Sequence, residues 1–111
     1  MQFLFIISHD DRFRPTTALT RDIGAWIRKM DGRGIRVYGN PLQPPGTATT
    51  VRVRGGKVLR TRGPFSRSKE QMCAYELVEC SSAEEAIAAA STHPMAKAAT
   101  IEVRPVWSEL V

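Results

Sequence analysis

The sequence is short of several residue types, and each shortage excludes a class of protein. No run of about 18 apolar residues occurs, so we expect no membrane-spanning helix. Two cysteines and two histidines, without a Cys-x-x-Cys motif, are too few for a typical zinc site. Motifs for dinucleotide or phosphate-loop binding are also missing. We therefore expect no metal, no cofactor and a cytoplasmic location.

Acidic residues are missing from the middle of the chain. None lies between Asp31 and Glu70, whereas this segment carries nine of the 16 lysines and arginines. The whole chain has a net charge of +5, so the residues outside the segment are net negative. A block of one sign produces a local field that favours anionic partners.

Hydrophobic periodicity predicts the elements and their order. Apolar alternation or periodicity indicates strands at 2–8, 35–39, 49–54, 57–62, 72–80 and 100–106, and helices at 17–30 and 83–92. The helix at 83–92 has a capping box of Ser82 and Glu85 at its start. This order predicts an α+β fold in which a ferredoxin-like βαββαβ domain, residues 1–111, carries an inserted β-hairpin.

The predicted hairpin has two different faces. Gly55-Gly56 between alternating runs indicates a two-residue turn. The resulting register places Val53 opposite Val58 and Val51 opposite Arg60. One face is therefore mostly apolar and the other mostly cationic.

The stretch from Pro41 to Gln71 carries motifs in a characteristic order. Gly55-Gly56 is followed by Gly63-Pro64-Phe65 and then by Ser68-Lys69-Glu70-Gln71, and the chain closes on Ile101–Trp107. Together they resemble the YCII-related family, in its branch named for an Asp-Gly-Pro-Phe tetrapeptide (the DGPF domain). The resemblance implies a homodimer in which two sheets pack face to face as a dimeric α+β barrel. It also implies a ligand cleft between the sheet and the partner.

His9 and Asp10 are the candidate catalytic residues. A histidine can act as an acid or base near neutral pH, and a His–Asp pair has been proposed for the wider family. The branch carries that histidine in its first helix, where residues 17–30 have none, so His9 would be its substitute. The alternative is an exposed loop histidine.

Basic residues after the hairpin turn are the first candidate ligand-binding residues. Arg60 and Arg62 share a strand face and could clamp a carboxylate or phosphate; alternatively they are a solvated pair. Arg62 stands where the family has aspartate, so any role of that aspartate is lost here. Lys69 and Glu70 match the family motif and could bind an anion or move a proton, or could instead form a loop-anchoring salt bridge.

Phe65 and His93 complete the candidate set. We expect Phe65 to be an apolar plug that holds its loop beside the cleft. His93 precedes Pro94 at a helix end, where a cation is favourable; the alternative is a ligand-binding role at the mouth of the barrel.

Three functions can be weighed from these residues. The favoured one is binding or transformation of a small anionic or aromatic molecule at the dimer interface, and whether any reaction occurs is left open. The alternative is a non-catalytic regulatory domain associated with sigma-factor-dependent transcription. Nucleic-acid binding by the hairpin is not expected, because its basic residues lack an aromatic platform for bases.

Overall fold

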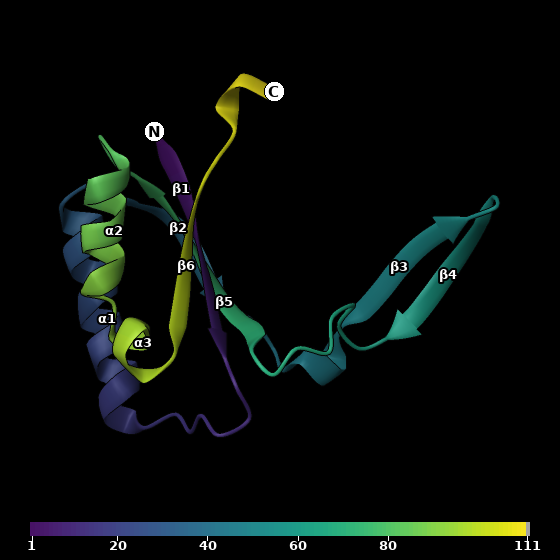
Figure 1. Ribbon diagram of the computed structural model, residues 1–111. Helices are drawn as coiled ribbons and strands as arrows, with labels where there is room; N and C mark the ends of the chain where they lie inside the picture. Colours follow the sequence, from purple (N-terminus) through teal and green to yellow (C-terminus); the bar gives the residue numbers. More distant parts are fainter. Residues whose placement is uncertain (111) are drawn as a thin grey trace.

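The computed structural model describes residues 1–110 (Figure 1). Its strands are β1 (Gln2–His9), β2 (Arg36–Pro41), β3 (Thr49–Arg54), β4 (Lys57–Arg62), β5 (Gln71–Glu79) and β6 (Thr100–Pro105). Its helices are α1 (Thr17–Gly32), α2 (Ala83–Ser91) and α3 (Pro94–Ala98), with short 3₁₀ turns η1 (Pro45–Thr47) and η2 (Ser108–Leu110). No helix in this part of the chain is long and apolar enough to cross a membrane.

Four of the strands form an antiparallel sheet in the order β2-β5-β1-β6. The three helices cover one face of this sheet (Figure 1). If the hairpin β3–β4 is set aside, the chain runs βαββαβ, and this strand order is that of a ferredoxin-like domain. The predicted α+β fold class is therefore confirmed.

The core lies between β1 and the helices. Phe3, Phe5 and Ile7 alternate along β1 and are at most 1% exposed. They pack with Trp26 of α1 and with the alanines of α2. The indole N–H of Trp26 donates to the carbonyl of Ala89 and to the hydroxyl of Thr92, both at 3.1 Å, and so ties α1 to the end of α2.

The helix boundaries follow capping chemistry. The Thr16 hydroxyl accepts from the backbone N–H of Leu19 and begins α1, and Gly34 adopts a φ of 70° just beyond its end. In α2 the Ser82 hydroxyl accepts from the N–H of Glu85, as the capping box predicts. The Glu85 carboxylate reaches Ser81, one residue further back than expected.

Strands β3 and β4 form a separate two-stranded ribbon, which we call the arm (residues 49–62); the rest of the chain is the body. The predicted register is confirmed, with Val53 opposite Val58 and Val51 opposite Arg60. Gly55 and Gly56 both have positive φ, as a tight hairpin turn requires. The arm projects from the body (Figure 1), which explains a radius of gyration of 15.9 Å where about 13 Å is typical of a compact chain of this length.

Candidate functional site

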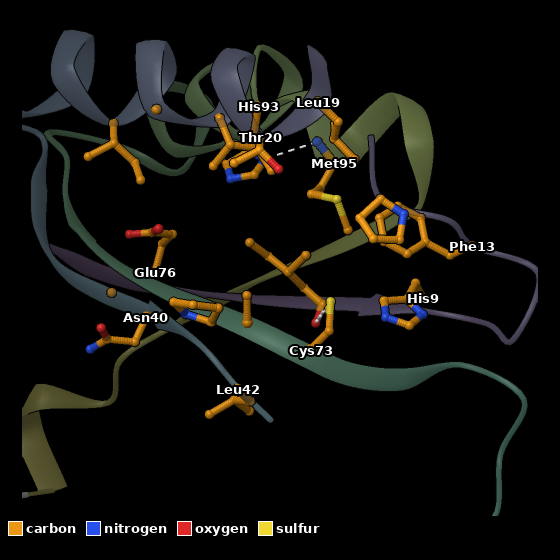
Figure 2. A pocket seen from close by; sticks show the side chains of 18 of the residues that line it. His9, Phe13, Leu19, Thr20, Asn40, Leu42, Cys73, Glu76, His93 and Met95 are labelled. Atoms are coloured by element: carbon orange, nitrogen blue, oxygen red, sulfur yellow. Dashed lines mark hydrogen bonds between the residues drawn. The ribbon is translucent and has the colours of Figure 1, made fainter. Parts of the chain in front are cut away.

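A cavity of about 590 Å³ opens between α1 and the helix-facing side of the sheet (Figure 2). Its wall is mainly apolar and comes from β1, α1, β2, β5 and the junction of α2 with α3. The apolar residues include Ile7, Phe13, Leu19, Ile23, Ile27, Leu42 and Met95. The polar or ionisable ones are His9, Thr20, Arg36, Asn40, Cys73, Glu76 and His93. The volume lies within the range typical of small-molecule sites.

His93 lines this cavity from the junction of α2 with α3 and is held in one orientation. Its Nδ1 accepts a hydrogen bond of 3.0 Å from the backbone N–H of Met95, and its ring lies 4.5 Å from that of Trp26. Burial lowers the pKa of His93 to about 4, so the ring is neutral at neutral pH. Because Nδ1 accepts, the proton is on Nε2.

The Nε2–H of His93 is available to a ligand. It makes no hydrogen bond within residues 1–110, and no fully buried side-chain nitrogen or oxygen in that range lacks a partner. The Nε2–H is therefore accessible, on a ring that lines the cavity.

His9 presents the opposite hydrogen-bonding character. Its Nδ1 lies 2.7 Å from the carbonyl oxygen of Asp10, which can only accept, so Nδ1 carries a proton. In the neutral ring Nε2 is then an acceptor. The ring stacks on Phe13 with centroids 4.5 Å apart. The cavity wall thus includes one histidine with a donor Nε2 and one with an acceptor Nε2.

An ion pair closes another part of the wall. Arg36 Nε donates to Glu76 Oε2 at 2.7 Å, Arg36 Nη2 donates to the carbonyl of Gly39 at 2.9 Å, and Nη1 lies 3.7 Å from Asp31. Burial raises the pKa of Glu76, and the hydrogen bond and charge of Arg36 oppose this. With two carboxylates beside it, Arg36 leaves little positive charge for an anionic ligand.

Cys73 contributes a thiol to the same wall. Its Sγ–H donates to the carbonyl of Ile7 at 3.4 Å, and burial raises its pKa. The group is therefore a thiol and not a nucleophilic thiolate at neutral pH. Cys73 and Cys80 are both free.

The structure brings two of the predicted site residues, His9 and His93, into one cavity (Figure 2). The Asp10 carboxylate accepts from the backbone N–H of Arg12 at 3.0 Å. His9 is instead in contact with the backbone carbonyl oxygen of Asp10. The expectation of a cationic cap at His93 is wrong. The ring is buried and neutral, and it caps the start of α3. The sequence did not predict this helix, because a proline just after one helix marks its end as readily as the start of the next.

The other predicted residues lie elsewhere. Arg60 and Arg62 are on the exposed arm. Lys69 and Glu70 border a depression of about 380 Å³ with Ile6 and Glu102, and Glu70 accepts from the Thr100 hydroxyl at 2.6 Å and forms no salt bridge with Lys69. The predicted plug role of Phe65 is wrong: its side chain is 80% exposed, because the chain leaves the arm at Gly63 outside the core.

Arg36 and Glu76 were missed as site residues. A signal for Glu76 was present, since it occupies an apolar position in the alternation of Ala74, Glu76 and Val78. A carboxylate at such a position is buried and needs a partner. Residues 1–110 contain no group of three His, Cys, Asp or Glu side chains that could hold a metal ion.

Comparison with known proteins gives two findings. The family model described as the YCII-related domain matches residues 1–109. A protein of Rhizobium meliloti (strain 1021), described only as uncharacterized, is 34% identical over 88 residues, which are 78% of this chain and 71% of that protein.

Proposed function

This chain belongs to the YCII-related family, and from that premise we propose that it binds a small, largely apolar molecule bearing a hydroxyl group in the cavity between α1 and the sheet. A hydroxylated aromatic compound is the class that fits. The observation that carries the proposal is the presence of two histidines with opposite hydrogen-bonding character in one apolar cavity. A hydroxyl is both donor and acceptor, so it can bond to either ring.

The charge of the cavity favours a neutral ligand over an anion. Arg36 is neutralised by Glu76 and Asp31, and His93 is uncharged at neutral pH. A carboxylate placed in this cavity would lose hydration without gaining a free cation. Of the two ligand classes that the sequence suggested, anionic and aromatic, the second is therefore the better supported.

A homodimer is proposed as well, as the resemblance implies. The face of the sheet opposite the helices carries Leu4, Ile6, Tyr75 and Leu77, all only partly buried. An apolar sheet face is normally covered by another layer. A second copy would supply that layer.

Calorimetric titration with matched probes tests the ligand proposal. We expect phenol to bind more tightly than toluene, which lacks the hydroxyl, and than benzoate, which is charged. Ile23→Trp fills the cavity and should abolish binding, whereas Ile87→Trp, on the exposed side of α2, should not. Tighter binding of benzoate than of phenol, or equal binding by the two tryptophan variants, would overturn the proposal.

A further inference from the structure

The arm carries the net charge of the whole protein. It holds five cations and no carboxylate, and the chain as a whole has a net charge of +5, so the body is neutral. All five are exposed, and they are Arg52, Arg54, Lys57, Arg60 and Arg62. Within residues 1–110 none of them forms a salt bridge, whereas Arg36 and Arg104 of the body each do. Cations without carboxylate partners on a projecting element favour an anionic ligand.

Three of these cations lie in a row on one face of the arm. Arg54 is paired with Lys57 beside the turn, and Arg52 lies on the same face because it is two residues before Arg54. Residues two apart on a strand are separated by about 7 Å. Arg60 and Arg62 lie on the opposite face with the valines. The row therefore offers several positive charges along a line, as binding to a phosphate backbone requires.

An exposed aromatic ring lies at the base of this row. Phe65 is 80% exposed and borders a hollow of about 430 Å³ together with residues 49–52 of β3. The Thr50 hydroxyl donates to the carbonyl of Gly63 at 2.8 Å and so ties the loop that carries Phe65 to β3. Thr50 and Arg52 are two residues apart and share a face of the strand. The loop thus holds an aromatic ring beside the first cation of the row.

We propose that the arm binds single-stranded nucleic acid, with one base stacked on Phe65 and neighbouring phosphates on Arg52, Arg54 and Lys57. An aromatic platform beside a line of cations is the usual means of binding a single strand. A duplex keeps its bases stacked inside and offers Phe65 no base face. The prediction against nucleic acid relied on the lack of an aromatic residue in the hairpin, and the loop after it supplies one. The arm has no amide or carboxylate side chain to read base edges, so we expect little sequence preference.

The stacking contact is tested with two exposed aromatic residues. The probe is a fluorescein-labelled oligothymidylate of about 12 nucleotides, and its binding is measured by fluorescence anisotropy at low salt. Phe65→Ala should raise the Kd at least about fivefold. Trp107→Ala, which removes a ring that is 68% exposed but lies outside the arm, should change the Kd less than about twofold. Near-UV circular dichroism of the buried Trp26 checks that both variants fold.

The phosphate contacts are tested with two pairs of substitutions that remove the same charge. Contacts of Arg52, Arg54 and Lys57 with three phosphates predict a slope of about 2 in a plot of log Kd against log salt concentration. Arg52→Gln with Arg54→Gln should lower this slope to about 1 or less. Lys29→Gln with Lys97→Gln, on the exposed sides of α1 and α3, should leave the slope unchanged. Equal losses of affinity for the two pairs would mean that only the overall charge attracts the probe.

Further probes decide the kind of partner. Binding of either oligothymidylate or oligouridylate supports the proposal, and the tighter of the two shows whether DNA or RNA is preferred. Tight binding of a duplex that Phe65→Ala does not weaken would overturn it, as would arm-dependent binding of anionic phospholipid vesicles without binding of either oligonucleotide. Ile23→Trp, which fills the cavity, should bind the oligonucleotide like the wild type. Failure of the cavity ligand and failure of the nucleic-acid site are therefore distinguishable.

Discussion

The body and the arm contain strands with the same kind of alternating sequence, yet only one of them has a core. Phe3 and Phe5 of β1 are at most 1% exposed, whereas Val53 and Val58 of the arm are more than half exposed. The difference is the presence of helices over one face of the body. Alternation therefore specifies a strand and its two faces, and burial depends on a second layer that the local sequence does not specify.

The largest expected effect comes from a methyl group added to the body. A Cβ on Gly39 would overlap the Glu76 carboxylate and lie 2.6 Å from the backbone oxygen of Tyr75. We expect Gly39→Ala to lower the free energy of unfolding by about 3 kcal/mol or more. Gly46, at the base of the arm, has no atom within 4 Å of such a Cβ, so Gly46→Ala should change stability by less than about 0.5 kcal/mol. Urea unfolding compares the two variants. Equal losses of unfolding free energy would show that the body tolerates the overlap at Gly39.

The fold of the body was predictable because its signals are local. The strand alternation, the capping box that begins at Ser82 and the Gly55-Gly56 turn together give the βαββαβ order with its inserted hairpin. Helix α3 was missed because proline can either stop a helix or begin one, and the choice depends on the chain that follows. The exposure of Phe65 was missed because burial is set by the layer packing.

Less of the candidate site was predictable. His9 and His93 were identified as chemical groups, but they lie far apart in the sequence and only the packing of α1 and α3 on the sheet brings them to one cavity. The Arg36–Glu76 pair joins two strands through a side-chain contact. The direction of each histidine hydrogen bond also depends on local geometry that a sequence does not contain.

The buried ring of His93 should make the folding stability depend on pH. Its pKa falls from an ordinary 6.5 to about 4 on folding. As the pH is lowered, the unfolded chain therefore binds a proton at a higher pH than the folded chain does. Stability that is fully present above pH 6.5 is then lost as the pH falls towards 4, by about 3 kcal/mol. His93→Asn can still accept from Met95 N–H but does not titrate, and its stability should fall less over this range.

Chemical denaturation at several pH values measures this difference. Glu76, whose raised pKa has the opposite effect, is common to both proteins, so the comparison isolates His93. Parallel pH profiles for the wild type and His93→Asn would mean that His93 is not buried as a neutral ring. The arm contains no histidine, so its variants should retain the wild-type profile.

A smaller effect is expected from the hydrogen bonds between α1 and α2. Trp26→Phe removes the indole N–H that donates to Ala89 and Thr92, and should cost about 1–2 kcal/mol. Leu59→Ala, also a truncation of a large side chain but on the arm, should cost less than about 0.5 kcal/mol in the monomer. Thermal unfolding at low protein concentration compares the two variants. A Trp26→Phe variant as stable as the wild type would show that these hydrogen bonds do not stabilise the contact between α1 and α2.

The smallest effect is expected from the largest change, excision of the whole arm. The N–H of Gly63 donates to the carbonyl of Ala48 at 2.7 Å, so the two ends of the arm already meet and Asn-Gly could close them. Since the arm contributes no residue to the buried core or to the cavity, the monomer should lose less than about 1 kcal/mol and bind phenol as before. A shortened protein that unfolds or loses the cavity ligand would show that the arm stabilises its own body, and the contrast between the two regions would then fail.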